Sequence, residues 1–297
     1  MSQITIQTPR GVFISGTFTR PVDSRDAAVI FSHTFLSDRH ASGMFDSLGR
    51  ALRRAGYATL AFDFSGHGES GDEIITFDPL IEDFRAASGW LADQGFARQI
   101  CVGHEFGATV ALRANPPSVQ TYVLVSPVLG PLSYDWDLVF SDVQLSDLER
   151  HGTTTVPDDS CSVRRHFTIN KGTLADMSMV SGEKALRGVT APILITHDSF
   201  DEETGLVDRT RDAFHLLPVG SLVEMTEPPV SSASTRRSTA CPSVTRPWRA
   251  PCAPPPPRVC PSCRTSPCSG RVGGCPWGAS CRGSSALKGM VSQKCRT

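Results

Sequence analysis

Short apolar runs alternate with amphipathic segments along most of the chain, and this alternation leaves few possible fold classes. Residues 27–32 read Ala-Ala-Val-Ile-Phe-Ser, an unbroken apolar run with the length of one strand. Strands of this type lie in parallel sheets, where helices bury both faces. Similar runs follow at residues 57–62, 99–102, 121–126, 192–196 and 221–225. Strands that alternate with helices predict a mostly parallel, doubly wound α/β sheet.

Helical spacing separates these strands. In residues 41–55 the apolar side chains Phe45, Leu48 and Leu52 fall on one face, which predicts an amphipathic helix. The other helices that we predict span residues 81–94, 108–114 and 207–216. Residues 133–185 carry mixed helical patches and no sheet signal, so we expect a helical lid inserted over a site.

The composition of the chain changes near Glu227. Residues 1–227 contain all 30 acidic residues and all eight histidines, but only two of the ten cysteines. Residues 228–297 contain 11 of the 29 basic residues, no acidic residue and four consecutive prolines. Such a segment has too little apolar surface to offset the entropy of ordering it. We therefore expect an α/β domain over residues 1–227 and an unstructured tail over residues 228–297.

Three origins are open for the tail. Its mixture of Pro, Arg, Ser, Gly and Cys is typical of GC-rich coding DNA read in the wrong frame, so our first hypothesis is a frameshift near Glu227. A genuine disordered basic extension is the simpler alternative. A zinc or disulfide module is the third, because Cys260 and Cys263 form a C-x-x-C pair, but no second such pair completes four ligands.

The charge and the apolar pattern limit the partners. Residues 1–227 carry 18 basic and 30 acidic side chains, a net charge of −12. This argues against a nucleic-acid or anionic-membrane partner. No apolar run approaches the ~20 residues of a membrane span, and the first residues lack a signal-peptide pattern. We expect a cytoplasmic protein with a small-molecule substrate, no metal and no cofactor; the oligomeric state stays open.

One pentapeptide combines a strand, a tight turn and a helix. Gly103-His104-Glu105-Phe106-Gly107 follows the buried run at residues 99–102 and leads directly into the helix predicted from residue 108. A strand-to-helix turn of the form G-x-S-x-G is the nucleophile elbow, which projects its central side chain into a site. In this sequence Glu105 occupies the central position.

Three further segments stand in a matching order. His33, Thr34 and Phe35 follow the first buried strand, residues 63–70 read Asp-Phe-Ser-Gly-His-Gly-Glu-Ser, and residues 197–201 read His-Asp-Ser-Phe-Asp. Together with the elbow they resemble the α/β-hydrolase superfamily, whose members carry an oxyanion loop, a D-x-x-G-x-G-x-S turn and an H-G-x-x-D segment there. The resemblance implies an α/β-hydrolase fold over nearly all of residues 12–227. It also implies that Asp201 is the acid of the catalytic site.

Two departures from the superfamily pattern bear on function. A serine hydrolase needs a hydroxyl that a histidine activates, and Glu105 supplies no hydroxyl. Family members also carry a histidine just beyond the last strand, whereas no histidine follows His215 here. A carboxylate at the elbow is instead placed to remove a proton next to a carbonyl. Backbone N–H groups of the Thr34/Phe35 loop and of Phe106 would then stabilise an enolate.

A narrower resemblance names a reaction. Residues 32–45, the glutamate at the elbow and residues 131–136, which contain Tyr134 and Trp136, are similar to the α/β-fold enzymes of tetronate and spirotetronate polyketide pathways. Those enzymes eliminate acetate from an acetylated hydroxymethyl tetronate and leave an exocyclic methylene. The resemblance implies a cofactor-free lyase with Glu105 as base, on a polyketide-type substrate. A hydrolase with an atypical nucleophile position and an inactive binding module are the alternatives.

Other side chains near these motifs have simpler interpretations. His33 either lines the oxyanion loop as part of the substrate-binding site or braces this loop through a hydrogen bond, and bracing is the simpler interpretation. We expect His104 to point away from the elbow tip, and His67 and His197 to be structural. Tyr134 and Trp136 begin the lid, where they either pack or stack on a flat lactone ring. Asp38, Arg39 and His40 either touch substrate or form a solvated loop, and the sequence does not decide between these.

The tail gives the first prediction. Limited proteolysis of the full chain should remove residues from about 229 onward first, because a segment without a packed core exposes its backbone to protease. Mass spectrometry of the products should show a resistant fragment that ends near residue 228. Resistance of the tail equal to that of the α/β domain would contradict the prediction.

Overall fold

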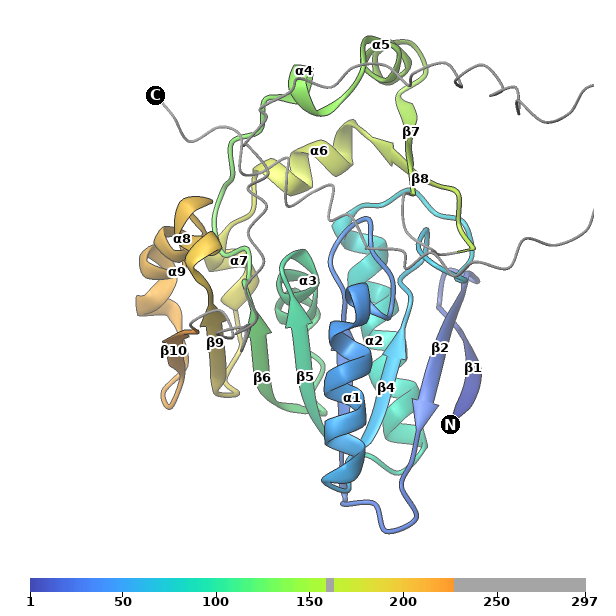
Figure 1. Ribbon diagram of the computed structural model, residues 1–297, viewed down its shortest axis with the longest axis vertical. Coiled ribbons are helices and arrows are strands. Elements are labelled where there is room, and N and C mark those ends of the chain that lie inside the picture. Colours follow the sequence, from blue (N-terminus) through green and yellow to red (C-terminus); the bar gives the residue numbers. More distant parts are fainter. Residues whose placement is uncertain (159–162, 227–297) are drawn as a thin grey trace, which may run out of the picture. The chain divides into compact units, whose positions relative to one another are not determined.

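The computed structural model describes residues 1–158 and 163–226. Residues 159–162 and 227–297, and with them the tail and its C-x-x-C pair, lie outside the described residues. The centre of the described domain is an eight-stranded sheet of order β1-β2-β4-β3-β5-β6-β9-β10 (Figure 1). The strands are β1 (Ser2–Gln7), β2 (Phe13–Thr19), β3 (Ala27–Ser32), β4 (Ala58–Phe62), β5 (Arg98–His104), β6 (Val119–Val125), β9 (Ile193–His197) and β10 (Leu222–Met225).

The sheet has the predicted mixed character. β1 pairs antiparallel with β2, and β2 pairs antiparallel with β4. From β4 to β10 every neighbouring pair is parallel. The carboxyl ends of the parallel strands therefore meet at one edge, which is where ligand sites form in open α/β sheets.

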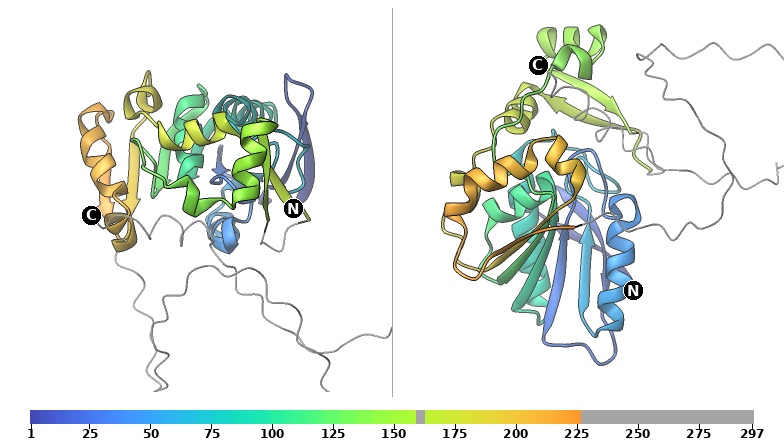
Figure 2. Two further views of the ribbon diagram at one scale, coloured as in Figure 1. Left: turned by 90° about the horizontal axis from the view of Figure 1, so that it is seen from above. Right: turned by 60° about the vertical axis from the view of Figure 1, so that its left-hand side comes forward.

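Helices bury both faces of the sheet, as the unbroken apolar runs predicted. Within β3, Ala28 and Ile30 belong to one hydrophobic cluster, whereas Val29 and Phe31 belong to another. The smaller cluster lies under α1 (Met44–Arg54), which follows the short η1 (Ala41–Gly43). The larger cluster lies under α2 (Phe77–Asp93) and α3 (Phe106–Ala114). Figure 2 shows α1 on one side of the sheet and α2 and α3 on the other.

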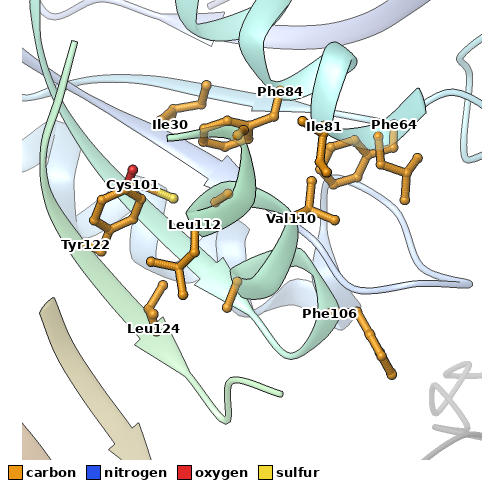
Figure 3. Close-up of a cluster of buried hydrophobic side chains, with 14 of the residues drawn as sticks. Ile30, Phe64, Ile81, Phe84, Cys101, Phe106, Val110, Leu112, Tyr122 and Leu124 are labelled. Atoms are coloured by element: carbon orange, nitrogen blue, oxygen red, sulfur yellow. The ribbon is translucent and has the colours of Figure 1, made fainter. Parts of the chain in front are cut away.

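The α3 helix is the centre of the larger cluster. Val110 and Leu112 of this helix are fully buried, as are Cys101 of β5 and Tyr122 and Leu124 of β6. Figure 3 shows these side chains gathered between the helix and the strands. Because α3 begins directly after the elbow, this packing fixes the position of the elbow itself.

The inserted segment contains more than helices. It consists of α4 (Trp136–Val139), α5 (Asp142–Arg150), the antiparallel pair β7 (Thr153–Pro157) and β8 (His166–Asn170), and α6 (Lys171–Ser178). The expectation that this segment lacks strands was wrong. The sequence does contain a short indication of β7: residues 153–156 read Thr-Thr-Thr-Val, a β-branched run that favours a strand. Figure 1 shows the insertion above the carboxyl ends of the parallel strands.

Hydrogen bonds fasten the insertion to the segment before α2. The backbone N–H of Ile75 donates to the Thr168 carbonyl at 3.1 Å. The Thr173 hydroxyl donates to the Ile75 carbonyl at 2.5 Å, and Asp176 accepts the Phe77 N–H at 2.7 Å. These contacts hold the insertion at its β8–α6 side, whereas α4 and α5 come earlier in the inserted segment.

The chain then returns to the sheet. α7 (Gly182–Leu186) packs against α3, so the lid ends before it and not at residue 185. α8 (Ser199–Glu203), α9 (Leu206–Ala213) and η2 (Phe214–Leu216) connect β9 to β10. In the part of the chain that the structure describes, every helix is too short or too polar to cross a membrane.

Asp83 of α2 is a buried carboxylate that joins this helix to the turn between β1 and β2 and to the turn after β4. Asp83 is fully buried and accepts the Ser65 N–H at 2.8 Å, the Ser65 hydroxyl at 2.6 Å and an Arg10 guanidinium N–H at 2.7 Å. Burial raises the pKa of Asp83, and the bonds from Ser65 and Arg10 oppose that rise. Three segments distant in sequence thus depend on one side chain.

Removing this carboxylate should destabilise the domain. We expect Asp83→Ala to lower the free energy of unfolding by about 3 kcal/mol, because it leaves Arg10 and Ser65 without their buried partner. The matched control is Glu82→Ala, which removes a partly exposed carboxylate 2.7 Å from the same arginine and should cost about 1 kcal/mol or less. Urea unfolding of both variants checks this, and equal losses would contradict it.

Candidate active site

Glu105 sits at the tip of a strained turn between β5 and α3. Its φ is 46° and its ψ is −118°, a conformation that a residue with a side chain adopts only where the surroundings enforce it. The Glu105 N–H donates to the Val125 carbonyl at 3.0 Å, and its carbonyl accepts the Ala108 N–H at 3.1 Å. This is the backbone geometry of a nucleophile elbow, and the side chain is 24% exposed.

The two glycines of the elbow permit its close packing. A Cβ added to Gly107 would lie 2.2 Å from the His33 carbonyl oxygen and 2.4 Å from that of Ser32. A Cβ added to Gly103 would lie 2.7 Å from the Cα of Ala108. The Ser32 hydroxyl also donates to the Gly107 carbonyl at 2.7 Å. The amino end of α3 therefore lies directly against the loop after β3.

This contact places the start of α3 beside the loop that follows β3. Thr34 and Phe35 lie on the loop after β3, and Phe106 is the first residue of α3, where backbone N–H groups have no partner within the helix. The rings of Phe35 and Phe106 stack with centroids 4.9 Å apart. The site thus has backbone donors beside an apolar wall of two buried rings.

Two neutral histidines hold the loops around the elbow. The His33 Nε2 accepts the Phe64 N–H at 3.0 Å, while its Nδ1 lies 2.8 Å from the Thr34 carbonyl and donates to it. The His67 Nε2 accepts the Leu36 N–H at 3.2 Å. Burial lowers the pKa of His33 and lowers that of His67 well below the ordinary value. Each ring is an acceptor and a donor at once, so both brace the loops, as expected.

A buried ion pair settles the role of Arg39. Its guanidinium donates to Asp63 at 2.8 Å and pairs with Glu69, and its backbone N–H donates to Asp63 at 2.7 Å. Gly68 is needed in this turn, because a Cβ there would lie 2.2 Å from an Asp63 carboxylate oxygen. Arg39 therefore fastens the loop after β3 to the turn after β4. His40 instead faces solvent beside Asp46.

His104 does not lie where the sequence analysis placed it. Its Nε2 lies 3.6 Å from the Glu105 carboxylate, and its side chain is 14% exposed. The expectation that it points away from the tip was wrong. The residue before an elbow tip belongs to the strand, where side chains alternate, but here the sharp turn at Glu105 brings both side chains to the same region.

Asp201 lies just after β9, at the edge where β5 and β6 also end. It is buried, and it accepts bonds from His197 Nδ1 at 3.0 Å and from the Asp198 N–H at 3.2 Å. Burial raises the pKa of Asp201, but bonds from His197, Ser126 and the backbone outweigh burial, so its pKa lies below the ordinary value. Asp201 is therefore ionised and already partnered.

Aromatic side chains of the lid form a stack that begins near Glu105. The Tyr134 and Trp136 rings stack at 4.7 Å, and Trp136 continues to Phe140 at 5.6 Å. Burial raises the pKa of the Tyr134 hydroxyl, and the negative charge of Glu105 raises it further. The Tyr134 hydroxyl of the lid is therefore close enough to Glu105 to respond to its charge.

The structure gathers most of the predicted site residues around the elbow. Glu105, Thr34, Phe35, Phe106 and Tyr134 lie at the elbow, the loop against it and the lid. The sequence analysis missed Ser126, which follows β6 with a φ of 52° and bonds to Asp201. In residues 1–158 and 163–226 no group of three or more His, Cys, Asp or Glu side chains could hold a metal ion.

Comparisons with known proteins match this architecture. A family model described as serine aminopeptidase, S33, matches residues 23–149. No curated protein sequence matches the chain. DcsB, solved in complex with its substrate analogue, has a TM-score of 0.59 at 17% identity, over 76% of this chain and 89% of DcsB.

Two other solved structures are similar to this chain in fold. The α/β hydrolase GrgF from Penicillium sp. sh18 has a TM-score of 0.59 at 15% identity, over 76% of this chain and 89% of GrgF. The esterase domain of a Rhodothermus marinus protein has a TM-score of 0.53 at 23% identity, over 76% of this chain and 87% of that domain. The chain has the α/β-hydrolase fold, as the motifs predicted.

The neutral histidines give a pH prediction. In the unfolded chain a histidine binds a proton below about pH 6.5, but folded His67 stays neutral because burial lowers its pKa well below the ordinary value, and its Nε2 accepts the Leu36 N–H. The unfolded state then binds more protons, so the free energy of unfolding falls as the pH drops below about 6.5. We expect His67 to contribute a slope of up to about 1.4 kcal/mol per pH unit.

Urea unfolding between pH 5 and 7.5 measures this slope. His67→Gln should reduce the slope by the contribution of one bound proton, about 1.4 kcal/mol per pH unit, because a glutamine does not titrate. His215→Gln, which changes an exposed histidine, is the control and should leave the slope unchanged. Identical slopes for the wild type and His67→Gln would show that His67 titrates normally in the folded chain.

Proposed function

We propose that this chain, an α/β-hydrolase-fold protein, is a carbon–oxygen lyase. In the proposed reaction Glu105 removes a proton from an acetylated hydroxymethyl tetronate of a polyketide pathway, and acetate leaves to give an exocyclic methylene. One observation carries the proposal: a carboxylate occupies the elbow tip, where the hydrolases of this fold carry their nucleophile.

The chemistry of a carboxylate favours proton transfer at this position. Glu105 accepts the proton from the carbon next to the ring carbonyl. The electron pair of that C–H bond forms the new C=C bond, and the bond between the exocyclic CH2 carbon and the acetoxy oxygen breaks. Acetate leaves with the electron pair of that bond, and Glu105 is left protonated. No metal, oxidant or cofactor enters this balance.

The backbone donors support the same reaction. Removal of the proton moves negative charge onto the carbonyl oxygen and forms an enolate. The Phe106 N–H lies at the amino end of α3, and the Thr34/Phe35 loop lies against it. Donors fixed in place before the reaction stabilise such a charge without reorganisation.

The lid supports a flat, apolar substrate. Tyr134 and Trp136 present stacked rings next to the elbow, and aromatic faces pack well against a planar ring. The stacked rings of Phe35 and Phe106 add a second apolar surface beside the elbow. We infer a small-molecule substrate that is bound in the cytoplasm without a cofactor.

Asp201 takes a supporting role in this proposal. In hydrolases that resemble this chain the equivalent acid orients a histidine that follows the last strand. Here its bonds to His197 and Ser126 hold the ends of β9 and β6 in place. We propose that Asp201 holds the carboxyl ends of β6 and β9 next to the site, and that His197 orients the Asp201 carboxylate.

The experiment offers an acetylated hydroxymethyl tetronate to the full chain and to Glu105→Gln. We expect acetate release together with an exocyclic alkene, and a loss of about 10²–10⁴-fold in Glu105→Gln, because the base is removed. Mass spectrometry of the organic product and an acetate assay measure both. Glutamine keeps the size of the side chain, so unfolding curves of both proteins should coincide.

The product decides between reaction classes. Acetate release that regenerates the free alcohol would mean hydrolysis and would overturn the lyase. A fluorophosphonate probe should label no serine, because none stands at the elbow tip; stoichiometric labelling would point to a serine hydrolase. Tight binding without turnover in either protein would indicate an inactive binding module.

A further inference from the structure

The side chains of His104 and Glu105 face each other, although they are consecutive in the sequence. The His104 Nε2 and the Glu105 Oε1 are 3.6 Å apart. This separation is within the range of an ion pair and slightly longer than a hydrogen bond. Catalytic contacts often tighten when substrate binds, so an apo distance of this size is compatible with proton transfer.

The backbone of both residues is held in place by hydrogen bonds. Glu105 is fixed on one side by its N–H bond to Val125 at 3.0 Å and on the other by the Ala108 bond to its carbonyl at 3.1 Å. His104 is the last residue of β5, which is bonded on both sides to β3 and β6. Both side chains are mostly covered, at 14% and 24% exposure.

The proposed lyase needs a group that takes a proton from Glu105 after each turnover. After elimination, Glu105 holds the proton that came from the substrate. It must lose that proton before the next turnover. The His104 Nε2 lies 3.6 Å from the carboxylate that must lose this proton.

We propose that His104 is the positioning residue of Glu105, orienting its carboxylate and taking the substrate proton from it after elimination. This inference rests on the proposed function. The Glu105 O–H bond breaks, a bond from Nε2 to the proton forms, and the carboxylate is restored. The imidazolium then releases the proton to water, so the sum of the steps is substrate to alkene, acetate and one proton.

The surroundings of the pair allow a transient positive charge on His104. Its titratable neighbour on the loop after β3 is His33, and burial lowers the pKa of that ring. His33 is therefore neutral and does not repel an imidazolium. On the lid side the titratable neighbour of Glu105 is Tyr134, whose hydroxyl also stays neutral because burial and the charge of Glu105 raise its pKa.

The kinetic experiment compares the full chain with His104→Gln and His104→Ala on the acetylated tetronate. We expect kcat to fall about 100-fold in both variants with KM within about twofold, and the acidic limb of the kcat–pH profile to change its midpoint. Added imidazole should restore part of kcat in His104→Ala. The control His215→Gln changes an exposed histidine and should leave kcat unchanged.

A structural role would behave differently. It would lower the stability and the amount of folded protein, but imidazole would not rescue it and the pH profile would keep its midpoint. Wild-type kcat and an unchanged pH profile in His104→Gln, with an active wild type, would overturn the role of His104 and leave the lyase intact.

A second measurement does not depend on activity. The His104 ring signals, followed by NMR against pH in the full chain, should show a titration midpoint that falls in Glu105→Gln, because the carboxylate that favours the charged ring is gone. An unchanged midpoint would overturn the pair even in an active enzyme. If the wild type releases no acetate, the lyase fails, and this midpoint alone decides whether the two side chains are coupled.

Discussion

The close contact between the amino end of α3 and the loop after β3 is the constraint on which the site depends. Gly107 has no room for a Cβ, because two carbonyl oxygens of that loop would lie within 2.4 Å of it. The contact forces Glu105 into a backbone conformation with a φ of 46°. The strain is compensated by the burial of α3, whose Val110 and Leu112 are fully enclosed. The core therefore stores conformational energy at the residue that we assign as the base.

Around this contact the loops are held by groups that do not react. Neutral His33 and His67 accept backbone N–H bonds, and Arg39 pairs with Asp63 inside the domain. Each of these polar side chains is buried and makes hydrogen bonds, which offset most of the cost of burying it. Such a frame keeps backbone donors in place before charge develops, which is the requirement for stabilising an oxyanion or an enolate.

The fold alone does not specify the reaction. Solved structures with TM-scores of 0.53 to 0.59 include an esterase domain and a protein described as an α/β hydrolase, at identities of 15% to 23%. Function on a shared fold is determined by the residues of the site. In this chain a carboxylate, Glu105, occupies the elbow tip, and the His104 Nε2 lies 3.6 Å from it. In the lyase that we propose, this pair would remove a proton, whereas a serine hydrolase of this fold begins with nucleophilic attack.

The sequence by itself determined the sheet, the elbow and the identity of its tip. Apolar runs and Gly-x-Glu-x-Gly are local patterns, and burial on both sheet faces follows directly from them. The tertiary structure decided what local patterns do not contain: that His104 turns toward Glu105, that Asp201 is bound by His197 and Ser126, and that Arg39 is buried. The β7–β8 pair was missed for a related reason, since a short β-branched run becomes a strand only when a partner pairs with it. Side-chain direction at a turn depends on contacts between segments far apart in the chain, and such contacts leave no periodic signal in the sequence.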